Sequence, residues 1–541
     1  MNKKGFVLTE TLMVTVFIVV IFTFVYTAVI PLIGIYRDKA DRENNIDIAY
    51  KLYHLRKMIK QDENGADIIQ SDLRRVDCVD LVNQEYCSNL MHYLDLNQYD
   101  LIFTKSIAEN FEDIKGINKE VEEYIKPYEE SNVPCLILLD KEKHTIVHLN
   151  YDNINVMGTF SDTIINRRQN ITEIYFKKEP TITINAKYRE IDSSLKTDIT
   201  YDNQGRVLAW LEDDPNNAGK YILYIESNDI TYLHEGSELF AYFNNLKKID
   251  FGNANTKMVT DMTHMFRGCL NLTNLDLRIF NTSNVESFEL MFLDCKNLVS
   301  IDVSSFYTPK AKRMVGMFNG CEKLTSLNLS NFNTSNVIDM DLMFALCKSL
   351  ENLNINSFDT KNVETMEGMF NGCEKLTSLN LSNFNTTKVK NMSNMFEECK
   401  ELAYLNVSSF NTSLVENMRN MFSGDRKLTV LNLSNFNTSK VIDMSGMFRK
   451  CESLIVLNLS SFKTSNVNNM SYMFSECYEI ETIYVSNLWT TGAVTNSSNM
   501  FYYNNAIVGG NGTRWNDDNP IDKTYARIDS SGNPGYFTLW T

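Results

Sequence analysis

The sequence predicts an α+β N-terminal region, made of a long N-terminal helix and a small antiparallel sheet, followed by a solenoid with 26-residue repeats. Three observations support this fold class. Residues 6–36 are apolar except for one formal charge. Short apolar segments bounded by turn residues follow beyond position 134. The pair Met-Phe then recurs every 26 residues through the second half of the 541-residue chain.

Composition limits the classes of function. Apolar residues make up 43% of the chain and charged residues 22%, which are ordinary globular values. The net charge of −16 repels phosphate backbones, so we expect no nucleic-acid partner. Six histidines leave little material for His-centred catalysis, and the sequence shows no catalytic triad, phosphate loop or thiolate–metal cluster. We therefore expect neither an enzyme nor a bound cofactor or metal.

The N-terminal segment combines basic residues with a long apolar run. Lys3-Lys4-Gly5 precedes the run from Phe6 to Tyr36, which contains only Glu10 as a formal charge. About twenty apolar residues in a helix cross the ~30 Å hydrocarbon layer of a membrane. An ionised carboxylate there costs on the order of a few kcal/mol unless a cation pairs with it. Apolar residues at helical spacing continue beyond Asp38, so we expect one membrane and stalk helix over residues 6–62.

The segment Lys3-Lys4-Gly5-Phe6-Val7-Leu8-Thr9-Glu10 resembles the processing site of type IV prepilins and pseudopilins. The resemblance implies a leader of residues 1–5, cleavage between Gly5 and Phe6, and methylation of the new N-terminus at Phe6. It also implies that Glu10 faces the terminal amine of a neighbouring subunit during assembly. The partners would then be prepilin peptidase and pilus or pseudopilus subunits.

The middle of the chain predicts a pilin-like α+β region over residues 63–165 and a β-rich region capping the solenoid over 166–238. The expected strands are Cys135–Asp140, Thr145–Tyr151, Ile171–Phe176, Thr181–Tyr188, Thr197–Tyr201 and Arg206–Leu211. Cys78 and Cys87 would lie outside the cell, where disulfides persist. Both a bridge between them and two free thiols are open interpretations.

The repeats occupy residues 239–508, and one unit can be read from Met317. Leu327 and Leu329 alternate with polar residues, which predicts the inner face of a short strand. The other apolar positions fall three or four apart, which suits a helical return. Stacked units would form one parallel sheet and bury a continuous core. The predicted core positions of this unit are Met317, Phe318, Cys321, Leu324, Leu327, Leu329, Phe332 and Val337.

The landmarks Met-Phe, Cys, Leu, Phe-x-Thr and Val-x-x-Met resemble those of the BspA-like leucine-rich repeat surface proteins of bacteria. Residues 525–529 and 534–537 also look like the closing segment of that family, within an expected C-terminal cap of residues 509–541. The resemblance implies a surface protein that binds host matrix proteins or neighbouring cells.

The outward positions of the predicted strands are small and neutral, and one of them is an asparagine in six consecutive repeats. Amides bonded from repeat to repeat are one interpretation, and a polar surface for glycan or protein contact is another; both can hold. The candidate binding face consists of Asn328, Asn354, Asn380, Asn406, Asn432 and Asn458.

Together these features predict an adhesin or other binding protein, displayed at the cell surface and anchored in a membrane or pilus by the N-terminal helix. Its repeats would bind a host or bacterial surface protein or glycan. The alternative is a structural minor pilin or pseudopilin of a secretion or DNA-uptake complex, whose repeats contact other parts of the machine.

Overall fold

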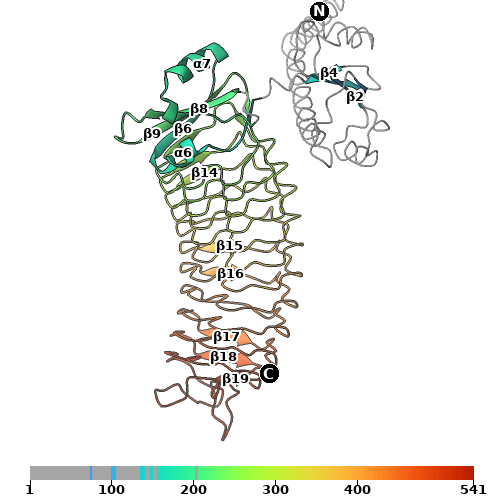
Figure 1. The fold of residues 1–541 in the computed structure, drawn as a ribbon. Helices are drawn as coiled ribbons and strands as arrows, with labels where there is room; N and C mark the ends of the chain where they lie inside the picture. The colour runs from blue at the N-terminus through green and yellow to red at the C-terminus, as the bar shows by residue number, and fades with distance from the viewer. Residues whose placement is uncertain (1–73, 76–98, 105–134, 141–145, 150–154, 202–204) are drawn as a thin grey trace, which may run out of the picture. The chain divides into compact units, whose positions relative to one another are not determined.

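The computed structural model describes residues 74–75, 99–104, 135–140, 146–149, 155–201 and 205–541 (Figure 1). The chain divides into two compact units, residues 1–154 and 155–541. The described part of the first unit is an antiparallel sheet in the order β1-β2-β3-β4. Its strands are β1 (Arg74–Arg75), β2 (Tyr99–Thr104), β3 (Cys135–Asp140) and β4 (Ile146–Leu149). Gly5, Phe6, Glu10, Cys78 and Cys87 lie outside the described residues.

The second unit begins with an α/β cap. Its sheet has the order β11-β6-β9-β8-β7, in which β7 and β8 pair antiparallel. The elements of the cap are β5 (Asn155–Met157), α6 (Asp162–Ile165), η5 (Arg168–Asn170), β6 (Ile171–Lys178), α7 (Thr181–Glu190), η6 (Ser193–Leu195), β7 (Lys196–Asp198), β8 (Val207–Asp213), β9 (Tyr221–Ser227) and β10 (Thr231–Leu233).

The strand predicted over Thr181–Tyr188 is wrong, because these residues form helix α7. The alternating Thr and Ile residues suggested a strand, but a strand would place Ile182 and Ile184 on one face. The helix separates them: Ile184 packs with Leu208 and Trp210 of β8, whereas Ile182 is 85% exposed. Helix α7 therefore covers the outer face of the cap sheet with a single buried isoleucine.

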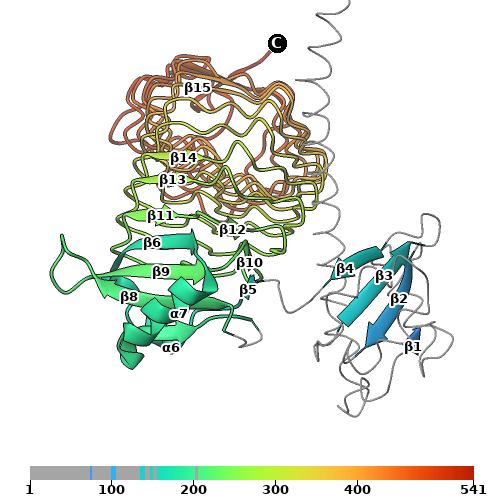
Figure 2. The ribbon, with the colours of Figure 1, turned by 90° about the horizontal axis from the view of Figure 1, so that it is seen from above.

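The solenoid continues directly from the cap. Strand β11 (Lys248–Asp250) pairs in parallel with β6, so that Ile249 lies opposite Ile174. Later rungs stack in register at 26-residue steps, and seen from above they overlap (Figures 1 and 2). The remaining strands are β12 (Ala254–Asn255), β13 (Asn274–Asp276), β14 (Ser300–Asp302), β15 (Ser378–Asn380), β16 (Tyr404–Asn406), β17 (Val456–Leu459), β18 (Thr482–Val485) and β19 (Phe537–Leu539).

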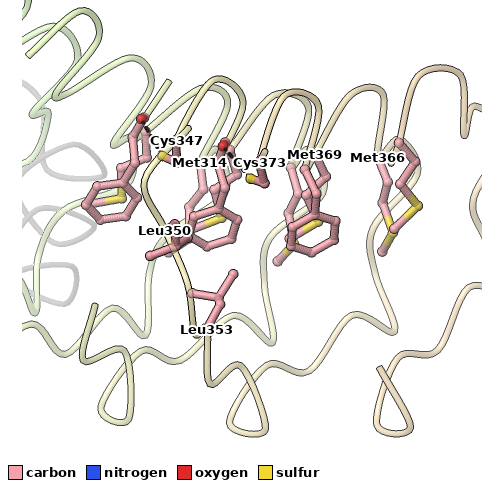
Figure 3. Packing of buried hydrophobic residues seen from close by; sticks show 14 of the residues in the cluster. Met314, Cys347, Leu350, Leu353, Met366, Met369 and Cys373 are labelled. Atoms are coloured by element: carbon pink, nitrogen blue, oxygen red, sulfur yellow. Dashed lines mark hydrogen bonds between the residues drawn. The ribbon is translucent and has the colours of Figure 1, made fainter. Parts of the chain in front are cut away.

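Equivalent side chains stack from rung to rung in the core. The rings of Phe318 and Phe344 lie parallel, with centroids 5.9 Å apart and an interplanar angle of 2°. Each cysteine of the repeat register donates its thiol hydrogen to a carbonyl of the preceding rung, as Cys347 does to Phe318 O at 3.2 Å (Figure 3). The core positions Met317, Phe318, Cys321, Leu324, Leu327, Leu329, Phe332 and Val337 are all buried.

The helical return expected in each repeat is replaced by two tight turns. The residues before Met317 and before Cys321 are Gly316 and Gly320, and their φ angles are +52° and +75°. Two left-handed residues four positions apart prevent a helix. The backbone instead bonds to the next rung, since Phe318 N donates to Met343 O at 2.9 Å. Residues spaced three and four apart thus face the core from turns.

The predicted fold class, which included a long N-terminal helix, is also wrong. The described residues contain two α-helices, α6 with four residues and α7 with ten, and are otherwise mostly short strands and turns. The long helix was predicted for residues 6–62, which lie outside the described residues. Neither helix in the described part of the chain has the length and apolar character of a bilayer-spanning segment.

Candidate binding face

The outward side of the stacked strands forms columns of equivalent residues. Parallel pairing in register places Asn380 opposite Asn406 and Ser378 opposite Tyr404. We call Asn328, Asn354, Asn380, Asn406, Asn432 and Asn458 the amide column; its members are exposed or partly exposed. The strand face is the outward surface that contains this column and its two neighbouring columns.

Each amide of the column closes a turn within its own rung. The Oδ1 of Asn432 accepts a hydrogen bond from the backbone N–H of Ser434 at 3.1 Å, and the other five asparagines do the same at 2.9–3.2 Å. This is an Asx turn. Bonding between neighbouring amides of the column therefore does not hold these asparagines in place. The one amide of the column that reaches another rung is Asn380, whose Nδ2 donates to Asn356 Oδ1 at 3.2 Å.

The strand face carries no charge over six consecutive rungs. Three outward positions per rung, from residue 326 to residue 460, are filled by Ser, Asn, Tyr or Val. These positions are Ser326, Asn328, Ser330, Asn352, Asn354, Asn356, Ser378, Asn380, Ser382, Tyr404, Asn406, Ser408, Val430, Asn432, Ser434, Val456, Asn458 and Ser460.

Ion pairs occur on other surfaces of the same rungs. Lys348 Nζ lies 2.8 Å from Glu322 Oε2, and Lys390 Nζ lies 2.8 Å from Glu364 Oε2. The three rungs nearest the cap are charged on the strand face itself: Arg278 Nη2 lies 2.6 Å from Asp276 Oδ2. Hydrogen bonds from Arg278 lower the pKa of Asp276. Beyond these first rungs the strand face is thus uncharged, whereas other positions of the same rungs carry ion pairs.

Sequence reasoning missed an apolar column beside the last three amides. Tyr404, Val430 and Val456 occupy the same position in consecutive rungs and are 64%, 71% and 48% exposed. The equivalent position is Ser326, Asn352 and Ser378 in the three preceding repeats, so the change to Tyr and Val was visible in the sequence. In the rungs that follow toward the C-terminus, the rings of Tyr484 and Trp540 pack edge to face with centroids 5.1 Å apart. The C-terminal part of the strand face is therefore both uncharged and partly apolar.

The described residues contain no group of three or more His, Cys, Asp or Glu side chains that could hold a metal ion. The eight repeat cysteines are unbridged and buried. Burial raises the pKa of Cys295, Cys373 and Cys477 to about 12, which keeps these thiols protonated and poorly nucleophilic.

These features define a solenoid repeat protein with an exposed strand face. The family model described as "Mycoplasma protein of unknown function, DUF285" matches residues 234–344, 322–429 and 401–515, which together make up more than half of the chain. The chain belongs to this family. The prediction of BspA-like repeats is confirmed for the matched region, whereas the prepilin-like segment lies outside both the matches and the described residues. No curated protein matches the chain.

Proposed function

We propose that this chain is a surface-displayed adhesin that binds a protein or glycan partner through its strand face. The observation that carries the proposal is the uncharged strand face on a chain with a net charge of −16. A repeat family compatible with a binding role supports it.

The cost of desolvation favours binding at an uncharged surface. Burying a charge at an interface costs free energy unless a partner charge pairs with it, whereas amides, hydroxyls and apolar groups are buried at lower cost. The centres of protein interfaces are accordingly depleted of charge. Stacked backbone hydrogen bonds hold the outward side chains on a rigid support. A partner can therefore approach the strand face without meeting the ion pairs found elsewhere on the same rungs.

The surface location rests on the N-terminal sequence. Cleavage between Gly5 and Phe6 and pairing of Glu10 with a neighbouring subunit would deliver the chain to the outside of the cell. The same motif favours a second candidate function, that of a minor pilin or pseudopilin whose repeats contact the secretion or uptake machinery. Deletion of residues 239–508 separates the two: loss of cell binding with intact secretion supports the adhesin, and the reverse supports the pseudopilin.

The strand face is tested with a matched pair of charge substitutions in one rung. Val430 lies on the face, whereas Ile442 is an exposed residue outside it, 44% accessible to solvent. We expect Val430→Glu to weaken binding of the full chain to host cells by about tenfold or more, as for a charge placed in an interface core. Ile442→Glu should bind as the unmodified chain does. Equal binding by both variants, measured by flow cytometry, contradicts the proposal.

A further inference from the structure

We infer that the partner of the strand face is an uncharged oligosaccharide, which lies over the last three rungs of the amide column and the adjacent apolar column. The inference rests on the proposed function, because it names the class of partner bound by the same surface.

The position of the amide column holds aspartate in some rungs and asparagine in others. In the three rungs nearest the cap this position is an aspartate, and it makes the same turn: Asp302 Oδ1 accepts from Ser304 N at 3.0 Å, and Asp276 Oδ1 from Arg278 N at 3.1 Å. Either residue type therefore closes the turn. The turn alone does not explain why the next six rungs all carry asparagine. The two types differ in the second terminal atom, a carboxylate oxygen or an NH2 group.

The NH2 groups of the last three asparagines are held in a fixed direction. Because Oδ1 of Asn406, Asn432 and Asn458 is held by a backbone N–H of its own rung, the orientation of each amide is fixed. In the described part of the chain, their Nδ2 atoms make no hydrogen bond to protein. Three donors are thus presented in a row, beside the hydroxyls of Ser408 and Ser434. Such a row fits a ligand with regularly spaced neutral acceptors.

The apolar column and the absence of charge on these rungs both favour a neutral sugar as the ligand. Sugar rings have hydroxyl edges and apolar C–H faces, so they suit amide donors beside an aromatic ring such as that of Tyr404. Val430 and Val456 continue the apolar strip over the next two rungs. A protein surface would bring charged side chains at its rim, and an acidic glycan would bring carboxylates or sulfates. Neither would find a charged partner among the outward positions of these rungs.

The test is calorimetric titration of the full chain with neutral hexasaccharides of xylose, glucose, mannose and N-acetylglucosamine, and with a heparin hexasaccharide as charged contrast. We expect at least one neutral probe to bind and heparin not to bind. Asn432→Asp keeps the turn but replaces the donor with a carboxylate, and should weaken binding by about tenfold or more. Tyr404→Ala should weaken it similarly.

The matched control lies in the same rung. Asn437 Oδ1 accepts from Ser439 N at 3.1 Å, so Asn437→Asp makes the same chemical change in the same kind of turn, outside the strand face. Its affinity should stay within about twofold of the unmodified chain. Absence of binding to every neutral probe, or equal losses in the two variants, overturns the inference.

A cell-based measurement separates this failure from failure of the proposed function. If Val430→Glu abolishes cell binding, and protease treatment of the cells also abolishes it while periodate oxidation of their glycans does not, the partner is a protein. The proposed function then stands and the inference is overturned. If Val430→Glu leaves cell binding intact, both fail. Loss of binding after periodate oxidation supports the inference.

Discussion

The carboxylate of Asp425 accepts a hydrogen bond from the backbone N–H of Cys399 at 3.1 Å, inside a column that holds cysteine in the rungs on either side. Asp425 is fully buried, and its second carboxylate oxygen has no hydrogen-bond partner. Burial raises the pKa of Asp425 well above its ordinary value. The folded chain therefore favours the neutral acid at this position.

Replacing Asp425 with cysteine should stabilise the chain in a pH-dependent manner. Because the folded-state pKa is raised, the native protein binds more protons than the unfolded chain above about pH 4, and the contribution of Asp425 to stability falls as the pH rises. We expect Asp425→Cys to raise the free energy of unfolding by about 2 kcal/mol near neutral pH, and by less near about pH 4. Urea unfolding at the two pH values measures the difference. The reverse change, Cys373→Asp, should destabilise with the same pH trend; a pH-independent effect in both variants would contradict this account.

A second prediction concerns the buried threonines that connect neighbouring rungs. Thr386 Oγ1 donates to Asn411 O at 2.9 Å and accepts from Asn411 N at 2.7 Å. Thr386→Val has nearly the same shape but leaves both backbone groups unpaired, so it should cost about 1–3 kcal/mol. Thr386→Ser keeps the hydroxyl and serves as control. Chemical denaturation measures both, and a larger loss in the serine variant would refute this role.

A third prediction concerns the left-handed turns. Gly320 has a φ of +75°, and an added Cβ would lie 2.9 Å from Asp294 Oδ1. Gly320→Ala should destabilise the chain by about 1–2 kcal/mol, the cost of a left-handed conformation for a residue with a Cβ. Gly492 does not have a left-handed φ, and its added Cβ would meet nothing closer than 3.6 Å. Thermal unfolding should show little change for Gly492→Ala; equal losses at the two sites would exclude the conformational explanation.

A fourth prediction concerns the repeat thiols. All eight are free and buried, so a maleimide should label them only after denaturation and without added reductant. Peptide mapping by mass spectrometry identifies each labelled cysteine. An added thiol on the strand face, Ser434→Cys, should react in the native state and confirm that the reagent is active. Labelling that requires a reductant would indicate disulfides instead.

The period of the repeats and the position of the strands could be predicted from the sequence, because both depend on local spacing. Leu379 and Leu381 alternate with polar residues, and Leu379 lies opposite Leu405 one period later. The return could not be predicted from spacing alone. Met444, Met447, Phe448 and Cys451 are buried at helical intervals, yet Gly446 and Lys450 between them have φ angles of +60° and +57°. The recurring Gly before Met or Cys was the available signal of a turn.

The candidate site was predicted only in part, for a related reason. A repeated Asn identifies an outward column, but its spacing does not reveal whether Oδ1 bonds to the next rung or to its own turn. The apolar column could be found only by comparing one position across repeats. Ser378, two residues before Asn380, corresponds to Tyr404 and Val430 in the next two repeats. The junction of cap and solenoid, where Ile174 meets Ile249, joins segments far apart in sequence and carries no local pattern.

Part of the solenoid is repeated without change between two covered ends. The eighteen residues from Met317 to Thr334 are identical to those from Met369 to Thr386, two periods later. Strand β6 pairs with the rung strand nearest the cap, and β19 pairs with the last one. Unequal recombination between the identical stretches would add or remove whole turns while both ends keep their covering strands. The length of the solenoid can thus evolve by duplication, without a change of fold.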